Sequence, residues 1–304
     1  MVTFSIHVNL NDNMVNKIMI VRFLLLISLA LLLNSIASFA VTGPKIIVTD
    51  TDKVILLEKF NKFSKDKNLS TCDLMLKVGL DFRGTPYVAK TLDKDFDESL
   101  VVNLRELDCT TFVENVLSIA LAIKGGKPTY ETFCTQLEKI RYRNGHLNGY
   151  TSRLHYFSEW ITDNAAKGIV TDVTHKIGGL NHPLAINFMG THPNLYPQLN
   201  GNTPFIGKIR QVEKEISDRP FYFIPKEMVP KIESELMDGD IVAMTTRIAG
   251  LDVSHLGFIY KNGRQTFLLN ASSVDMMVEV THKTLAEYLN GSKSVTGIFV
   301  IRAM

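Results

Sequence analysis

The chain has 304 residues, of which 45% are hydrophobic, and its 33 Lys and Arg residues nearly balance 31 Asp and Glu, for a formal net charge of +2. This length is sufficient for one large domain with a buried core. A nucleic-acid-binding protein would need a clustered basic face. The balanced charge gives no such face, and this argues against that class of function. No internal repeat or low-complexity tract is present.

The N-terminal segment has the pattern of a secretory signal peptide. Lys17 and Arg22 flank the start of MIVRFLLLISLALLLNSIASFA, and Ser38 and Ala40 are the small residues that a signal peptidase requires. An uncleaved membrane anchor is the alternative, because the apolar run is nearly long enough to span a bilayer. Small residues, and no basic cluster, follow the run. We therefore expect cleavage after about Ala40, export to the periplasm, and membrane contact only through residues 1–40.

Residues 41–304 are expected to form a single domain whose first half is helical. Apolar periodicity predicts helices within 50–80, over 110–123, 130–141 and 154–166. Gly84-Thr85-Pro86-Tyr87 is a turn signal. Several prolines predict a long loop from about 178 to 207. The N-terminal helices would then be additions to the core of this single domain.

The C-terminal third changes to short segments rich in β-branched and aromatic residues. Asn262-Gly263 between two of them is a strong hairpin signal. Helices followed by consecutive strands predict an α+β fold with an antiparallel sheet. The expected strands cover residues 240–246, 253–260, 266–270, 276–280 and 296–302.

Three cysteines, Cys72, Cys109 and Cys134, lie beyond the signal segment. An odd number in an exported protein suggests at least one free thiol. A Cys72–Cys134 disulfide is conceivable, but a buried free cysteine is the preferred interpretation for both residues. Cys109 is different because it stands where an apolar helical repeat begins.

A helix start can activate Cys109. Free N–H groups and the positive end of the helix dipole stabilise a thiolate, so a cysteine there can have a lowered pKa. Asp108 is a candidate N-cap, and Thr111 with Glu114 could form a capping box one turn later. The two alternatives exclude each other and the sequence leaves them open. Alone, a cysteine on an apolar helix face is more often core filler than a nucleophile.

His255 is the candidate general base for Cys109. Alternation in DVSHLGFIYK places Val253, His255 and Gly257 on one strand face. If the hairpin pairs this strand with TFLLNASS, Asn270 can lie near the imidazole and orient it, as the third member of a Cys-His-polar triad does. A half-buried structural histidine and a turn-capping asparagine are the alternatives. The sequence lacks HExxH, CxxC and GxSxG, so neither a metal, a cofactor nor a serine elbow is predicted.

Six segments resemble the N-acetylmuramoyl-L-alanine amidase-like family, which belongs to the papain-like clan of NlpC-type cell-wall cysteine hydrolases. The resemblance runs from about Gly84 to Ile301. Its motifs are GTPYVAKTLD, VVNLRELDCTTFVENVLSIALA, IRYRNGHLNGYTSRLHYFSEWITDN, NFMGTHPNLYPQL, MDGDIVAMTTRIAGLDVSHLGFIY and LLNASS. It implies a papain-like α+β domain in which the nucleophile helix packs on an antiparallel sheet carrying the histidine.

The resemblance also implies an activity: cleavage of the amide between N-acetylmuramic acid and L-alanine in peptidoglycan fragments (muropeptides), through a thioester. Cys109 matches the family nucleophile, His255 the base and Asn270 the third polar position. Relatives are expected to have the motif LLHASS, with histidine at this position. Asn270 therefore departs from the family pattern, and this changes the group that orients and tunes His255. Tyr87 matches a site-lining tyrosine that can help hold the oxyanion, while Asp108 and Thr110 flank the nucleophile where the clan contacts the stem peptide.

Three residues are candidates for lining the sugar or peptide groove: Arg153, Tyr156 and His192. The alternative is that these side chains have a purely structural role. An endopeptidase cutting between D-glutamate and the diamino acid would use the same Cys-His pair. A catalytically inactive wall-binding or scaffold protein is the alternative from another class. Retention of both Cys109 and His255 favours an enzyme.

Overall fold

The computed structural model describes residue 19 and residues 45–304. Pro44–Met304 form one compact unit. The expected signal peptide, apart from residue 19, lies outside the described residues. Among the helices that are described, none has both the length and the apolar character needed to cross a bilayer.

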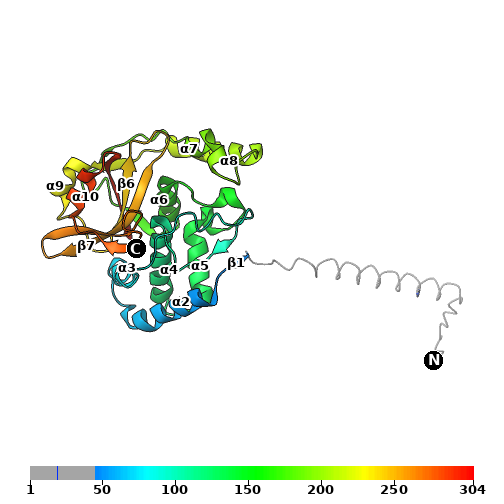
Figure 1. Cartoon of the computed structure of the whole chain (residues 1–304), viewed down its shortest axis with the longest axis horizontal. Helices are drawn as coiled ribbons and strands as arrows, with labels where there is room; N and C mark the ends of the chain where they lie inside the picture. Colours follow the sequence, from blue (N-terminus) through cyan, green and yellow to red (C-terminus); the bar gives the residue numbers. More distant parts are fainter. Residues whose placement is uncertain (1–18, 20–44) are drawn as a thin grey trace, which may run out of the picture. The chain divides into compact units, whose positions relative to one another are not determined.

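An antiparallel sheet forms one half of this unit, as the sequence predicted (Figure 1). Every strand pair in it is antiparallel. Its order is β4 (Leu180–Asn181), β5 (Tyr222–Pro225), β10 (Val295–Ala303), β6 (Ile241–Thr246), β7 (Val253–Asn262), β8 (Gln265–Ser272) and β9 (Met277–Val280), with β3 (Val170–Asp172) also paired to β10. A separate parallel pair joins β1 (Ile46–Ile47) to β2 (Leu100–Val101).

The predicted helices are present, with small differences at their ends. The segment 50–80 is two helices, α2 and α3, separated by a 3-10 turn at Ser64–Asp66. The predicted helix 154–166 begins three residues later, at Phe157. The longer helices are α2 (Asp50–Phe63), α3 (Thr71–Leu80), α4 (Cys109–Lys124), α5 (Tyr130–Arg141), α6 (Phe157–Ala166) and α8 (Thr203–Ser217), and the short ones are α7 (Phe188–Thr191), α9 (Val229–Ile232) and α10 (Leu285–Gly291).

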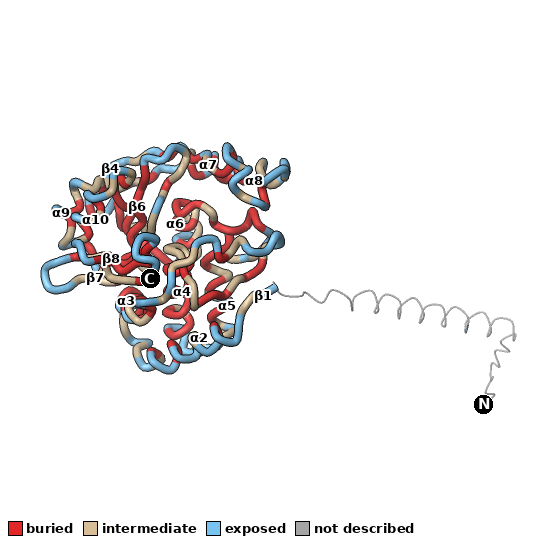
Figure 2. Tube along the Cα trace, in the orientation of Figure 1, coloured by how far each residue is buried: buried red, intermediate tan, exposed pale blue. Residues whose placement is uncertain are grey.

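Helix α4 is the central element of the core. It contacts α3 and α5 on its sides and β7 and β8 of the sheet, and most of its residues are buried (Figure 2). The ring of Phe112 meets that of Phe258 edge to face at 5.2 Å between centroids. Burying a side chain of this size contributes about 1.5–3 kcal/mol. This packing fixes the N-terminus of α4 against the strand that carries His255.

The expected loop over 178–207 is only partly irregular. It contains β4, α7 and a 3-10 turn at Pro193–Leu195, and α8 already begins at Thr203. Asn202 caps α8 by accepting from the backbone N–H of Phe205 at 3.2 Å. Pro204 lies in the first turn, where a helix tolerates proline because that N–H needs no intrahelical partner. The proline that suggested a loop therefore marks a helix start.

The β7–β8 hairpin forms as predicted. Asn262 pairs with Gln265 across the turn, and Gly263 takes a φ of 63°, a left-handed conformation that glycine adopts readily. The turn extends from the unit as an exposed loop (Figure 2).

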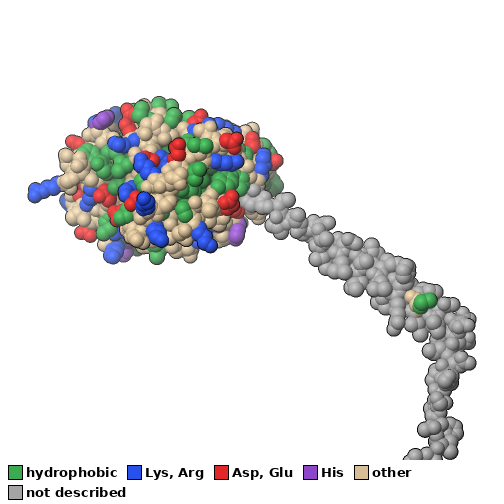
Figure 3. All heavy atoms as spheres, turned by 90° about the horizontal axis from the view of Figure 1, so that it is seen from below, with side chains coloured by type: hydrophobic (Ala, Val, Ile, Leu, Met, Phe, Trp, Pro, Cys, Tyr) green, Lys and Arg blue, Asp and Glu red, His purple; other side chains and the backbone are tan. Residues whose placement is uncertain are grey.

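Charges of both signs are interspersed over the face in Figure 3, consistent with the balanced composition. Within residues 45–304, no three His, Cys, Asp or Glu side chains form a group that could hold a metal ion.

Candidate active site

Cys109 is the first residue of α4, and Asp108 is its N-cap. The Asp108 carboxylate accepts from the backbone N–H of Thr111 at 2.8 Å, and the Thr111 hydroxyl accepts from the backbone N–H of Asp108 at 2.9 Å. This reciprocal box decides between the two caps that the sequence left open. Glu114 does not take part in a cap, because its carboxylate is buried against Arg141. The backbone N–H of Cys109 needs no intrahelical partner.

A β-bulge next to His255 changes the predicted alternation of its strand. His255 pairs with Met244, but Thr245 pairs with Val253, so Ser254 is an extra residue on β7. Val253 packs, partly buried, against the core cluster that contains Leu256, and it also lines the cavity that His255 lines. Bulges often redirect side chains beside functional sites. Here the bulge lies where β7 passes the start of α4.

Asn270 orients the His255 ring. The Nε2 atom of His255 lies 2.8 Å from Oδ1 of Asn270. An amide oxygen can only accept, so Nε2 carries the hydrogen and the neutral ring keeps a lone pair on Nδ1. Burial lowers the pKa of His255, and the Asn270 bond partly opposes this. The Nδ2 atom of Asn270 is buried without a hydrogen-bond partner.

Cys109 and His255 line one cavity of about 130 Å³, which we call the catalytic cavity. Its walls come from the start of α4, the segment before α6 and the bulged end of β7. Its other lining residues are Thr110, Leu154, His155, Tyr156, Phe157, Leu251, Asp252, Val253, Ser254 and Leu256. Two residues that are far apart in the sequence therefore line one cavity.

The pKa of the Cys109 thiol differs from the expectation of a lowered value. Burial is the largest effect and, with the charge of Asp108, raises this pKa to about 12. Donors at Leu256 and Thr110 act in the opposite direction without overcoming it. With the His255 pKa lowered as well, the unliganded pair is a neutral thiol beside a neutral imidazole.

Tyr87 lies near Cys109. Its backbone N–H donates to Met276 O at 2.9 Å, and a bridge to Leu107 holds it against the segment that leads into α4. Burial first, then the nearby Cys109 and Asp108 groups, raises the pKa of its phenol. The hydroxyl therefore stays protonated and can donate a hydrogen bond.

Asp108, Thr110 and Arg153 line a second cavity of about 210 Å³, which we call the polar cavity. Its remaining polar walls are Lys90, Asp93, Glu114, Tyr150, His155 and Tyr196. The two cavities share three lining residues, Thr110, Leu154 and His155. Arg153 is buried and pairs with Asp93 and Glu98.

Tyr156 and His192 are placed differently from the other candidates. Tyr156 lines the catalytic cavity, but its hydroxyl is engaged: it donates to Glu213 at 2.7 Å and accepts from Met189 N–H at 2.8 Å. His192 lines neither cavity. Its ring stacks on Phe188, and Nδ1 contacts the carbonyl of that residue.

His155 was not selected from the sequence, although it lines both cavities. Its position in SRLHYF, between the predicted groove residues Arg153 and Tyr156, is the sequence feature that could have indicated it. Asp252 was also missed: its buried carboxylate accepts from the backbone N–H of Ser158 at 2.7 Å and ties the start of α6 to the start of β7. Cys72 and Cys134 are buried and free, as preferred.

A family model described as N-acetylmuramoyl-L-alanine amidase-like matches residues 77–298. The chain belongs to this family. The recognised motifs, with Cys109, His255 and Asn270, fall inside the matched range. No curated protein matches the chain.

Solved structures agree with this membership. An N-acetylmuramoyl-L-alanine amidase from Bacteroides uniformis is 38% identical, with a TM-score of 0.74 over 77% of this chain and 99% of its own. A Bacteroides fragilis protein named as a proposed xylanase is 40% identical, with a TM-score of 0.71 over 75% of this chain and 99% of its own. A Legionella pneumophila protein, 20% identical, shares the fold with a TM-score of 0.63 over 83% of this chain and 95% of its own.

Proposed function

We propose that this amidase-like chain is a cell-wall hydrolase that uses Cys109 to cleave the amide between N-acetylmuramic acid and L-alanine. The observation that carries the proposal is the shared catalytic cavity of Cys109 and His255, with His255 fixed by Asn270. Family membership and the similar amidase from Bacteroides uniformis supply the substrate class. In this proposal the domain is a papain-like, NlpC-type hydrolase, and the N-terminal segment is a signal peptide that directs the enzyme to the periplasm.

The neutral resting pair defines the first step. As the Cys109 sulfur attacks the lactyl carbonyl carbon, Nδ1 of His255 takes the thiol proton, so the thiolate forms only during attack. The tetrahedral oxyanion accepts from the backbone N–H of Cys109 at the helix start, with the Tyr87 hydroxyl as second donor. The backbone donor belongs to the first turn of α4 and is therefore fixed before the charge develops.

Collapse of the intermediate breaks the C–N bond. His255 transfers its proton to the departing L-alanine amine, which leaves with the stem peptide, and the muramoyl group stays on sulfur as a thioester. His255 then takes a proton from water, the resulting hydroxide attacks the thioester, and the thiol is restored with release of the free lactyl carboxyl group.

Purified muropeptides digested with the wild-type protein and analysed by mass spectrometry test this proposal. We expect free muramic-acid sugar and an intact stem peptide. Cleavage within the peptide would instead identify the endopeptidase that the sequence also allowed. Binding without any product would identify a scaffold protein. Xylan incubated in parallel is expected to remain intact, and release of shorter sugars would contradict the amidase assignment.

The charge of the third triad residue is predicted to set the acid limit of activity. Burial lowers the pKa of His255 below its ordinary 6.5. We therefore expect His255 to become protonated, and wild-type kcat/KM to fall, only below that pH. Asn270→Asp places a carboxylate on Nε2 and stabilises the imidazolium. The acid limb should therefore move to higher pH by about one unit, as measured by kcat/KM against pH.

Asn270→Ala is the matched control for this change. It removes the orienting bond without adding charge, so kcat should fall by about tenfold to a hundredfold without an upward shift of the limb. An Asn270→Asp profile that superimposes on that of the wild type would mean that His255 is not the titrating base.

A further inference from the structure

His155 stands between the two cavities. It is one of the residues that line both the catalytic cavity and the polar cavity. His155 takes no part in the proton transfers proposed for Cys109 and His255. Its ring therefore meets any substrate that reaches from the nucleophile into the polar cavity.

The hydrogen-bonding state of this ring is fixed. Nε2 lies 2.9 Å from the carbonyl oxygen of Tyr150. A carbonyl can only accept, so Nε2 carries the hydrogen. Enclosure, and then the charge of Arg153, lowers the pKa of His155 to about 3, so the ring is neutral near pH 7. Nδ1 is consequently an acceptor, and the ring's hydrogen bond to the described residues 45–304 is the one made by Nε2.

The ring is also held rigidly. It packs against the Tyr150 ring with centroids 4.5 Å apart, and the Arg153 guanidinium lies 5.1 Å from the centroid of that same tyrosine. Preorganised groups of this kind discriminate between ligands better than mobile ones do. The His155 ring is therefore held in one orientation at a position that lines both cavities.

The polar cavity suits an uncharged, hydroxyl-rich group. Its cations, Lys90 and Arg153, are outnumbered by the carboxyl groups of Asp93, Asp108 and Glu114. The Arg153 charge is already neutralised by Asp93 and Glu98. An excess of free positive charge, which the carboxylates of a stem peptide would need, is absent from this lining. Tyr150 and Tyr196 add aromatic surface beside these polar groups.

We propose that the polar cavity binds the sugar ring of the muramoyl substrate and that Nδ1 of His155 accepts a hydrogen bond from a hydroxyl or amide N–H of that sugar. This inference rests on the proposed function. His155 is then a specificity-determining residue that distinguishes a muramoyl group from a bare lactyl group.

Two variants separate this acceptor from a structural role. His155→Gln can still donate to Tyr150 O but has no acceptor at the position of Nδ1, whereas His155→Asn places an oxygen near Nδ1 and loses the donor. Each is assayed on N-acetylmuramoyl-L-alanyl peptide and on N-lactoyl-L-alanyl peptide. We expect His155→Gln to reduce the preference for the sugar substrate, as the ratio of the two kcat/KM values, by about tenfold, and His155→Asn to retain more of it.

Equal losses on both substrates, with an unchanged ratio, would overturn the proposal and assign His155 to the scissile bond or to the fold. An unchanged ratio together with unchanged rates would overturn it as well. Thermal unfolding by circular dichroism identifies variants whose losses come from instability.

A binding experiment keeps the inference independent of turnover. If the wild type cleaves neither substrate, the proposed function fails, and titration calorimetry of N-acetylmuramic acid into Cys109→Ala protein still tests the sugar site. We expect binding that weakens by about tenfold when His155→Gln is added. No binding, or binding that this substitution leaves unchanged, would overturn the sugar assignment.

Discussion

Cys109→Ala is expected to reduce hydrolysis of the muramoyl–L-alanine bond by about 10⁴-fold or more, because no other group in the catalytic cavity can form the thioester. His255 alone retains a base but has no adjacent nucleophile to deprotonate. The measurement is the single-turnover rate of peptide release followed by mass spectrometry. Binding of the substrate should persist, since the polar cavity is unchanged.

Cys134→Ala is the matched control for the nucleophile. Cys134 is also a free cysteine on a helix, but it lies buried in α5 and lines neither the catalytic nor the polar cavity. Its replacement should leave kcat/KM within about twofold. A Cys109→Ala protein that folds normally and retains wild-type turnover would refute the cysteine mechanism, and the family's chemistry would then require a different group in this chain.

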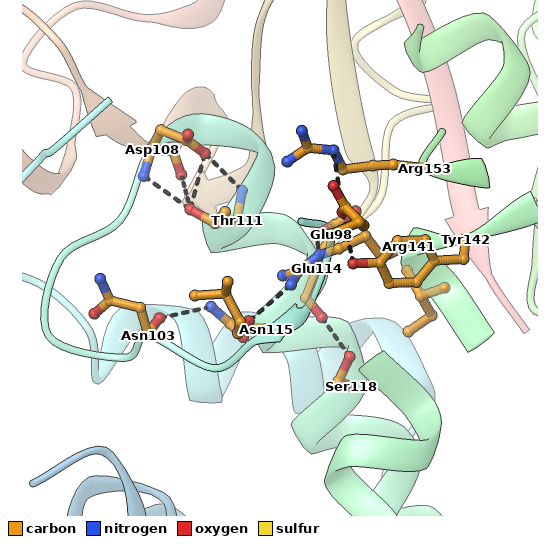
Figure 4. A network of polar contacts seen from close by, with 12 residues as sticks. Glu98, Asn103, Asp108, Thr111, Glu114, Asn115, Ser118, Arg141, Tyr142 and Arg153 are labelled. Atoms are coloured by element: carbon orange, nitrogen blue, oxygen red, sulfur yellow. Dashed lines mark hydrogen bonds and ion pairs between the residues drawn. The ribbon is translucent and has the colours of Figure 1, made fainter. Parts of the chain in front are cut away.

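Arg141→Met is expected to lower the free energy of unfolding by about 3–5 kcal/mol, the usual cost of leaving one member of a buried ion pair without its partner. Arg141 and Glu114 are 1% and 3% exposed, and their Nε and Oε2 atoms are 2.6 Å apart. Arg141 also donates from Nη1 to Val101 O at 2.7 Å. The pair thus joins α4, α5 and β2 (Figure 4).

The pH dependence of this loss has a definite sign. Burial already raises the pKa of Glu114, and the Arg141 charge opposes that rise. Without Arg141 the folded-state pKa rises further above the unfolded value, so the destabilisation is largest at neutral pH and shrinks as the pH falls toward 4.5. Urea unfolding at several pH values, followed by circular dichroism, measures it.

Two controls accompany the Arg141 variant. The double replacement Glu114→Leu with Arg141→Met should recover most of the loss, because an apolar pair of similar volume leaves no buried charge. Lys214→Ala removes one partner of an exposed ion pair, with Asp218, and should leave the urea midpoint unchanged. A single Arg141→Met variant as stable as the wild type would show that the buried pair carries no net stabilisation.

The placement of the nucleophile helix follows directly from local sequence. The spacing of Phe112, Val113 and Val116 predicted an amphipathic helix, and the structure has α4 with that face in the core. The hairpin signalled by Asn262-Gly263 and the flanking strands were likewise predicted, since a two-residue loop, here Gly263 and Arg264, fixes its own register. Such features depend on contacts between residues that are close along the chain.

Other features depended on contacts that no local pattern encodes. The bulge at Ser254 interrupts the regular register of β7, and burial raises the pKa of the Cys109 thiol at a helix start where local sequence predicted a lower value. Only the folded structure places His155 in the lining of two cavities. Tyr156, with an aromatic ring on the predicted groove, proved to have its hydroxyl engaged by Glu213.

The sequence by itself thus determined the helices, the antiparallel strands and, by resemblance, the family, because periodicity, turn chemistry and motif order are properties of the chain alone. Only the tertiary structure decided which cap begins α4, that Cys109 and His255 line one cavity, and that burial raises the pKa of the thiol and lowers that of the imidazole. Those facts are set by desolvation and by packing between distant segments, and neither quantity exists until the chain has folded.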